Sequence, residues 1–549
     1  MTVEDVAAPD AELSHDDVDS PAGRRNSVVA FLDAHATWVV LAVAAFAVAV
    51  GLVLRYRYYS FIEPGPDSDE AEFGLLAAQL LRGELPLLMR GQPYGGTPWL
   101  FAIAASIRAF GMNSFGLRLP TIVLGLVNSG LVFGIGVQLG WTRRRAVLAA
   151  AGVWCYPIAA VYFASRETMY FVPAITGGLA ALFFVLRMEA RRDPDELLGT
   201  GVVSRRGLFL AGVVAGAGFW VNPGSFYLSG PTFAWIGWRA LREAWALPAS
   251  APTRVLATLR PAVIAGIGGV VGAFPWIFLT VLGVDRRNNY AERDGYGLIE
   301  RLEFFALQQL PGWTGFKTPI GGYLEGIWMG GVVWKVGFVA FCALLLLQIV
   351  RRGAMRNESV LSVLAVSVPI IFLLVTAQSG PVYANLRYVF FAAPILGLLV
   401  ASKWRTDLAA AVAVLVLPLI SLAGVTSFQT QEGRTTEPTV ELLEARGARC
   451  AIGDYWAGGH RLQFQSEGEI IAISTYENRN PLYIDQAEDL GNCPWVFGDG
   501  SPTAAQFEAW LDDNGVRADV ERPGDGQVVY FPERRVWLTE VFPDALSGD

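Results

Sequence analysis

Histidine, lysine and cysteine are scarce in this chain of 549 residues, which holds three histidines, three lysines and four cysteines. The histidines are far apart, and neither an HExxH nor a CxxC motif occurs, so we expect no zinc site. No glycine-rich phosphate-binding motif is present, which argues against nucleotide chemistry. Charged residues make up only 17% of the chain, and its net charge of -8 is not typical of a protein that binds nucleic acid. The candidate chemistry therefore comes from carboxylates, arginines and aromatic residues.

Long apolar runs dominate the sequence instead. Apolar residues make up 53% of the chain, and a helix needs roughly 20 consecutive, mostly apolar residues to cross a bilayer. We therefore predict a polytopic α-helical membrane protein with about eleven transmembrane helices. The predicted spans are 37–54, 119–139, 146–163, 169–187, 207–222, 226–242, 262–282, 331–350, 360–377, 386–401 and 408–426.

The basic residues of the short loops predict the orientation of the chain. Cytoplasmic loops carry an excess of arginine and lysine, and basic loops alternate here with loops that have few charges. A cytoplasmic N-terminus beside Arg24 and Arg25 places Arg143–Arg145 and the later basic loops on the same side. With an odd number of spans, the C-terminal segment then lies outside the cytoplasm.

The two ends of the chain are acidic, unlike the apolar body. Residues 1–25 hold seven acids and two arginines, and residues 432–549 hold 22 acids and nine arginines. We predict a disordered cytoplasmic tail over 1–35, a transmembrane catalytic domain over 36–428 and an extracytoplasmic domain over 429–549. In the last of these, alternating helix-like and strand-like segments predict a small α/β fold.

Two of the four cysteines, Cys450 and Cys493, belong to this C-terminal domain. Disulfides form in oxidising compartments outside the cytoplasm, so the predicted orientation favours a disulfide between these residues. Two buried thiols on neighbouring strands are the alternative. Cys155 and Cys342 fall within apolar spans, where we expect inert core residues.

An acidic cluster follows the first span. Asp67, Asp69, Glu70 and Glu72 stand at the start of a helical apolar pattern over 70–82. Capping of a helix N-terminus is one interpretation. Four acids exceed what one helix end requires, so we also interpret Asp69 as a general base, which the helix dipole keeps ionised. A divalent cation bound by these carboxylates is a further alternative.

Gly91–Trp99 reads GQPYGGTPW and includes Gln92 and Tyr94. Glycine and proline predict a turn before a second short apolar helix over 98–110, and both short helices are expected to lie in the membrane interface. The turn either only shapes the chain or contacts the substrate.

Arg166 and Glu167 stand in a very short outer loop between two spans. They either pair with each other or bind substrate, because arginine is well suited to phosphate. Arg387 begins a late span with no acid nearby in the sequence, so it is a candidate for a functional charge, with snorkelling to the outer surface as the alternative. Lys317, in the long outer loop 285–330, is a further candidate cation.

Four sequence segments occur together in a characteristic order: DEAEFGLLAAQLLRGELPLLMRGQPYGGT, GLRLPTIVLGLVNSGLVFGIGVQLGWTRRRAVLAAA, YFASRETMYF and NLRYVFFAAPIL. Over residues 37–426 the chain thereby resembles the bacterial branch of the dolichyl-phosphate-mannose protein mannosyltransferase family, membrane glycosyltransferases of the GT-C class. The resemblance implies a bacterial plasma-membrane enzyme that moves a sugar from a polyprenyl-phosphate carrier to an extracytoplasmic glycan, lipid or protein. Many relatives read GQPYMGS followed by a carboxylate at the turn, where this chain has GQPYGGTPW, so the acceptor stays open.

The resemblance also implies roles for particular residues. The family's acidic pair matches Asp69 and Glu70, which makes these the expected catalytic residues, and Glu167 and Tyr388 match positions expected to bind substrate. Gln92 and Tyr94 are expected to bind substrate as well.

If Asp69 takes the proton of the acceptor hydroxyl and the acceptor attacks the anomeric carbon directly, the product is inverted. Arg387, Arg166 and Lys317 are the cations available for the donor phosphate.

A multispan transporter or a lipid-linked-sugar flippase is the main alternative, because it would also explain many spans and charges within the membrane. No internal repeat is evident in the sequence, and the charges gather near the outer surface, which favours the glycosyltransferase. A noncatalytic membrane scaffold that displays the C-terminal domain is a second alternative.

Overall fold

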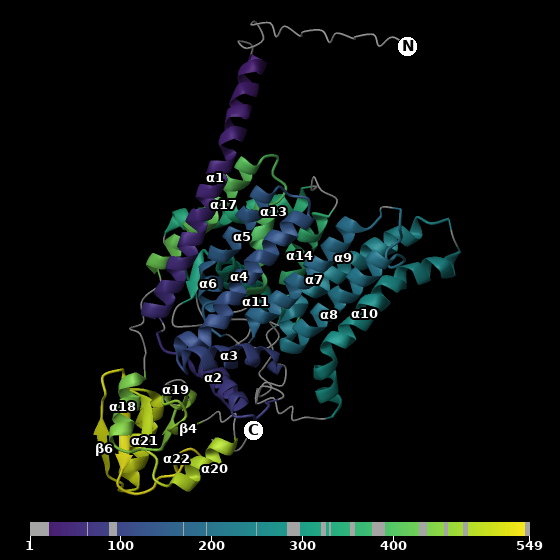
Figure 1. Cartoon of the computed structure of the whole chain (residues 1–549). Helices are drawn as coiled ribbons and strands as arrows, with labels where there is room; N and C mark the ends of the chain where they lie inside the picture. Colours follow the sequence, from purple (N-terminus) through teal and green to yellow (C-terminus); the bar gives the residue numbers. More distant parts are fainter. Residues whose placement is uncertain are drawn as a thin grey trace, which may run out of the picture.

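A bundle of apolar helices forms most of the chain, and a small domain with a β-sheet lies at one end of it (Figure 1). This computed structural model describes residues 21–62, 64–86, 96–167, 170–193, 195–248, 250–282, 297–319, 326–328, 331–351, 357–375, 390–427, 436–454, 459–475 and 481–543. In this part of the chain seven helices are long and apolar enough to cross a membrane: Ala36–Phe61, Ser114–Gln138, Phe171–Arg191, Val202–Val221, Ala251–Val281, Val332–Val350 and Asp407–Val425. The predicted polytopic helical architecture is therefore confirmed.

Each of the eleven segments predicted as a span contains helix. The seven long helices above belong to α1 (Pro21–Arg57), α4 (Ser114–Gln138), α7 (Phe171–Arg191), α8 (Val202–Val221), α10 (Ala251–Val281), α13 (Val332–Val350) and α17 (Asp407–Ser427). The other four segments hold α5 (Arg143–Cys155) with α6 (Ile158–Phe163), α9 (Phe226–Trp245), α14 (Ser359–Leu374) and α16 (Ala393–Ala401). The predicted number of eleven spans stays a prediction, because these four are shorter, broken or more polar.

Proline explains two of the breaks. Pro157 separates α5 from α6, and the short 3-10 turn η4 (Pro223–Ser225) separates α8 from α9. Proline lacks a backbone N–H and clashes with the preceding turn, so a helix tends to end before it. The interruption predicted at NPGSF is thus present.

The first helix begins earlier than predicted. α1 starts at Pro21 and continues through a π-helical turn, η2 (Tyr58–Ile62), so residues 21–35 are helical where the sequence predicted a disordered tail. Proline is well suited to the first position of a helix, and no further proline occurs before the apolar run. Residues 1–20, the remainder of the predicted tail, lie outside the described residues.

Two short helices lie at the end of the bundle next to the small domain (Figure 1). They are α2 (Ser68–Leu81) and α3 (Leu100–Phe110), the latter preceded by the 3-10 turn η3 (Thr97–Trp99). They match the two short apolar helices predicted over 70–82 and 98–110, and they pack against each other. The second long loop contributes α11 (Leu298–Phe304), η5 (Phe305–Gln309), α12 (Leu310–Trp313) and two antiparallel strands, β1 (Lys317–Pro319) and β2 (Gly326–Trp328).

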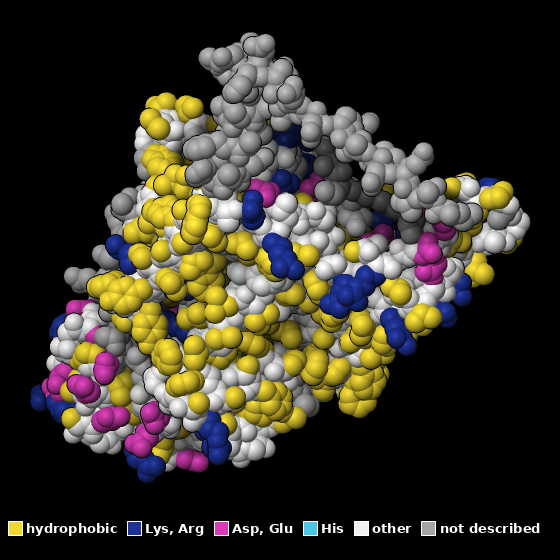
Figure 2. Space-filling model, turned by 45° about the horizontal axis from the view of Figure 1, so that its top comes forward, with side chains coloured by type: hydrophobic (Ala, Val, Ile, Leu, Met, Phe, Trp, Pro, Cys, Tyr) yellow, Lys and Arg dark blue, Asp and Glu magenta, His cyan; other side chains and the backbone are white. Residues whose placement is uncertain are grey.

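Glycine allows α8 and α10 to pack at very short range. A Cβ at Gly212 or Gly216 of α8 would lie 2.1 Å from a backbone carbonyl oxygen of α10, so no side chain fits there. Small residues let helix backbones approach closely, which is how helices associate in lipid, where no hydrophobic effect drives them together. Many apolar side chains gather on the face of the bundle that Figure 2 shows, as expected of a surface in contact with lipid.

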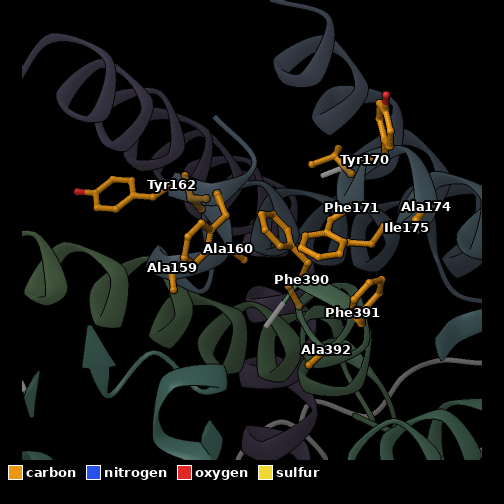
Figure 3. Close-up of a cluster of buried hydrophobic side chains, with 14 of the residues drawn as sticks. Ala159, Ala160, Tyr162, Tyr170, Phe171, Ala174, Ile175, Phe390, Phe391 and Ala392 are labelled. Carbon is orange, nitrogen blue, oxygen red and sulfur yellow. The ribbon is translucent and has the colours of Figure 1, made fainter. Parts of the chain in front are cut away.

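An aromatic cluster connects α6, α7 and the segment before α16 (Figure 3). The ring of Phe390 lies 5.5 Å from that of Phe163 and 6.2 Å from that of Phe171. Phe391 stacks on Tyr227 of α9 with 4.4 Å between the ring centroids. Buried aromatic pairs of this kind add about 0.5–1.5 kcal/mol each beyond their burial, so they fix the short loop that joins α6 to α7.

The C-terminal segment folds into helices and a five-stranded sheet with the order β4-β3-β5-β7-β6. The strands are β3 (Cys450–Gly453), β4 (Ile471–Ser474), β5 (Trp495–Gly498), β6 (Ala518–Glu521) and β7 (Gln527–Pro532). The first three are parallel, β7 pairs antiparallel with β5, and β6 pairs antiparallel with β7. The helices are α18 (Glu437–Ala445), α19 (Gly459–Gln465), α20 (Pro481–Leu490), α21 (Pro502–Asp513) and α22 (Leu538–Val541). The predicted small α/β fold is therefore present, and a disulfide joins Cys450 to Cys493.

Candidate active site

Helix α2 begins with the acidic cluster, and two of its acids cap the helix. Asp67 is the N-cap residue: its carboxylate accepts from the backbone N–H of Glu70 (2.8 Å), and the Glu70 carboxylate accepts from the backbone N–H of Asp67 (3.3 Å). This reciprocal arrangement is a capping box, which satisfies N–H groups that the start of a helix leaves without an intrahelical partner. The capping interpretation therefore accounts for Asp67 and Glu70.

Glu70 also forms a bidentate ion pair with Arg118 of α4. Nε of Arg118 donates to Oε1 of Glu70 (2.9 Å) and Nη2 donates to Oε2 (2.6 Å), and both side chains are 0% exposed. The same Nη2 donates to the carbonyl of Gly65 (2.7 Å). Burial of a charge is tolerated only when the charge is paired and hydrogen-bonded, so each partner requires the other. This pair ties the start of α2 to the start of α4.

Arg166 forms the second ion pair of the cluster. Its Nη2 lies 2.6 Å from Oδ2 of Asp67, and its Nη1 donates to the hydroxyl of Tyr58 (3.5 Å). Arg166 and Asp67 are both buried. The loop between α6 and α7 is thereby joined to α2 and to η2, the turn that continues α1. The sequence had left open that Arg166 pairs with its neighbour Glu167 instead.

Glu167 lies in the same loop and is buried among hydrogen-bond donors. Its carboxylate accepts from Trp99 Nε1 (2.7 Å), Thr121 Oγ1 (2.7 Å) and the backbone N–H of Tyr170 (3.2 Å), and its own backbone N–H donates to Glu70 (3.0 Å). Burial raises the pKa of Glu167 to about 7, although these hydrogen bonds act in the opposite direction. A carboxyl group that titrates near neutral pH is suited to proton exchange.

Asp69, the predicted base, lies in the first turn of α2 and is 6% exposed. The positive end of the helix dipole stabilises a carboxylate at this position. Glu72, one turn further along, is also buried. Among the residues that the structure describes, no three histidine, cysteine, aspartate or glutamate side chains are placed to hold a metal ion.

Lys317, predicted to bind the donor phosphate, lies in β1, and its Nζ donates to Oε1 of Gln308 (2.6 Å). β1 packs against α6, the helix that leads to Arg166, so these two predicted phosphate ligands lie on neighbouring elements. Four further predicted binding residues lie outside the described residues: Gln92, Tyr94, Arg387 and Tyr388.

The structure thus brings together Asp69 and Glu70 of α2 with Arg166 and Glu167 of the loop between α6 and α7. Sequence reasoning assigned no role to several residues that hold this group in place: Tyr58, Trp99, Arg118, Thr121 and Tyr170. Arg118 carried a usable signal, since it stands at the start of an apolar span, where an arginine needs a partner. The other four carried no such signal, because buried aromatic and hydroxyl residues are common in any core.

No protein-family model matches the sequence, and no curated protein matches it either. Solved structures do. ArnT from Cupriavidus metallidurans in the apo state has a TM-score of 0.55 at 13% identity, over 90% of this chain and 97% of that chain. The same protein bound to undecaprenyl phosphate has a TM-score of 0.54 at 14% identity, over the same shares.

AglB, the oligosaccharyltransferase of Archaeoglobus fulgidus, has a TM-score of 0.46 at 14% identity in its complex with an inhibitory peptide and a dolichol-phosphate, over 89% of this chain and 74% of that chain. The similarity to ArnT extends over nearly all of both chains and establishes the architecture: the chain has the fold of the GT-C glycosyltransferases.

Proposed function

We propose that this chain is a membrane glycosyltransferase that moves a sugar from a polyprenyl-phosphate carrier to an acceptor outside the cytoplasm. One observation carries the proposal: a buried cluster of acids and arginines at the start of α2, within a fold shared with a protein whose structure holds undecaprenyl phosphate. The resemblance to the mannosyltransferase family, carried by the sequence segments around these same residues, supports the same reaction. A mannose or arabinose donor fits this proposal, and we leave the acceptor class open.

The proposed reaction is a single displacement with inversion. The acceptor oxygen forms a bond to the anomeric carbon while the bond from that carbon to the phosphate oxygen breaks, and its electron pair leaves with the polyprenyl phosphate. Asp69 takes the proton of the acceptor hydroxyl. Arg166, whose guanidinium is oriented by Asp67 at the start of α2, is one of three cations proposed for the leaving phosphate; the others are Lys317 and Arg387.

Glu70 has a positioning role in this proposal. Both of its carboxylate oxygens accept from Arg118, and one of them also accepts from the backbone of Glu167. An ion pair of this kind fixes the start of α2, so that the neighbouring Asp69 is presented in one orientation.

The proposed orientation places α2 and the C-terminal domain outside the cytoplasm. α4 starts beside Glu70 and is 25 residues long, so it rises about 37 Å, enough to cross the hydrocarbon core. The basic segment Arg143–Arg145 that follows it therefore lies at the opposite end of the bundle from α2. Because cytoplasmic loops carry the basic residues, α2 belongs to the outer side. A bacterial plasma membrane fits both this arrangement and the family resemblance.

Asp69→Asn tests the proposed function. The variant, reconstituted in proteoliposomes with undecaprenyl-phosphate-linked mannose or arabinose and envelope acceptors, is expected to transfer sugar about 10²- to 10⁴-fold more slowly than the wild type, the usual contribution of a general base. Asp407→Asn is the matched control: Asp407 is likewise an aspartate in the first turn of a helix, but it pairs with Arg145 at the far end of the bundle, and its loss is expected to leave transfer unchanged. Normal sugar transfer by Asp69→Asn would refute the assignment of Asp69 as the general base. If the wild type translocates the donor lipid without sugar transfer, the flippase is favoured instead.

A further inference from the structure

Helix α2 is covered on two sides, which is unusual for a helix at a membrane surface. All residues from Ser68 to Gln79 are buried. On the side of the bundle, the ring of Phe73 contacts that of Tyr170, with 4.5 Å between centroids. On the other side, α19 and α20 of the C-terminal domain pack against α2, as Figure 1 shows for α19. An interfacial helix normally leaves one face in water, so the C-terminal domain here takes the place of solvent.

Phe464 of α19 makes the tightest of these contacts. A Cβ at Gly74 of α2 would lie 2.1 Å from Cε2 and 2.5 Å from Cδ2 of the Phe464 ring, so only glycine allows the ring to sit there. Glycine within a helix is less favourable than alanine, because it loses more backbone freedom on folding, and the ring contact offsets this loss. The Phe464 side chain is fully buried in the hydrophobic cluster that also contains Phe73 and Leu76.

A second contact lies further along the same helix. Nε2 of Gln79 donates to the hydroxyl of Tyr483 in α20 (3.0 Å), and both side chains are buried. Gln79 lies more than one turn beyond Gly74, so two points of the C-terminal domain hold α2 and fix both its rotation and its axial position.

The face of α19 that meets α2 is also the face that carries positive charge. Arg461 precedes Phe464 by three residues, so it lies on the same side of α19 one turn earlier, and it is buried. α2 carries four acids at its start, of which Arg118 and Arg166 pair with Glu70 and Asp67. A cationic face against an acidic helix adds favourable electrostatic complementarity to the steric fit.

We propose that the C-terminal domain is a positioning element of the catalytic site: Phe464, seated on Gly74, sets the position of α2 and thereby of Asp69. The inference rests on the proposed function for its catalytic meaning, while the contact itself is independent of it. Phe464 is a positioning residue, because it acts through α2 and not on the substrate. The membrane bundle and the C-terminal domain are then one functional unit.

The test uses the full chain in lipid nanodiscs with three variants: Gly74→Ala, Phe464→Ala and the double variant. Gly74→Ala forces a methyl group against the ring, so it is expected to speed hydrogen exchange of the α2 backbone and to lower kcat with undecaprenyl-phosphate mannose by about 100-fold, while KM for the donor stays within a factor of about three. Phe464→Ala removes the ring that a methyl group at position 74 would meet. The double variant is therefore expected to have the kcat and the α2 hydrogen exchange of Phe464→Ala alone. Gly237→Ala in α9 is the control, because a Cβ at Gly237 meets no atom within 4 Å.

The outcomes separate the inference from the proposed function. Unchanged exchange of α2 in both Gly74→Ala and Phe464→Ala would overturn the inference, as would a double variant that loses as much as the two single changes together. If Gly74→Ala fails to fold, Phe464→Leu replaces it in the test. The inference then requires that Phe464→Leu lowers kcat less than Phe464→Ala does. Absence of any transfer by the wild type would refute the proposed function alone, since hydrogen exchange still decides whether Phe464 holds α2.

Discussion

The buried pair of Glu70 and Arg118 gives the sharpest quantitative prediction. Both side chains are 0% exposed, and two hydrogen bonds of 2.9 and 2.6 Å join them. Arg118→Met removes the cation and leaves the Glu70 carboxylate buried without its charge partner. Breaking such a pair costs about 3–5 kcal/mol, because the remaining charge keeps its desolvation penalty. At about 4 kcal/mol, the ratio of folded to unfolded protein falls roughly 1,000-fold.

The assay is a double-mutant cycle in detergent, with reversible unfolding as the readout. Arg118→Met, Glu70→Gln and the double variant are compared with the wild type. Because the double variant no longer buries an unpaired charge, it is expected to be destabilised by at least 1 kcal/mol less than the sum of the single variants, within the range of about 0.5–3 kcal/mol for residues in contact.

A matched control comes from an exposed pair in the C-terminal domain. Arg522 lies 3.3 Å from Asp499, with side chains 57% and 47% exposed. Arg522→Met is expected to cost less than about 1 kcal/mol, because water screens an exposed pair. Single changes at Glu70 and Arg118 that add within about 0.5 kcal/mol would refute the reasoning, since independent sites behave in that way.

Two further predictions concern the loop after α6 and the C-terminal domain. Burial raises the pKa of Glu167 from 4.5 to about 7, so the folded protein binds more protons than the unfolded chain between these pH values. Its stability is therefore expected to fall as the pH rises from 4.5 to 7. Glu167→Gln is expected to flatten this dependence in thermal unfolding, and an unchanged slope would contradict the burial argument. Cys450→Ser opens a covalent loop of 43 residues, so by the loop-entropy relation the free energy of unfolding of the C-terminal domain is expected to fall by about 4 kcal/mol. Denaturant unfolding of the oxidised wild type and of the variant measures this difference. Equal unfolding midpoints would contradict the prediction.

Local pattern was sufficient to predict most of the elements. Lipid cannot satisfy backbone hydrogen bonds, so an apolar segment long enough to cross the bilayer forms a helix, which satisfies them internally. The long helices therefore follow directly from the apolar runs. α2 and α3 follow from helical spacing, and the strands of the C-terminal domain follow from short β-rich segments between turns. The start of α1 was predicted too late because a partly polar segment can still belong to a helix when no proline interrupts it.

The site was predictable only in part. The acids of α2 and the pair Arg166 and Glu167 stood out because charge next to an apolar span is costly and needs a reason. Their partners did not, because pairing between distant segments depends on how the helices pack. The sequence could not show that Arg118 holds Glu70 and not the neighbouring Asp69, because the two carboxylates are chemically nearly identical.

The sequence by itself determined that this chain crosses a membrane many times and carries an acidic helix start next to its first span, because hydrophobicity and local charge act over a few neighbouring residues. Only the tertiary structure decided which arginine meets which acid, and that Phe464 of the C-terminal domain rests on Gly74 of α2. These contacts join residues far apart in the chain, and they form because side chains of matching shape and charge exclude solvent together, which local sequence pattern does not encode.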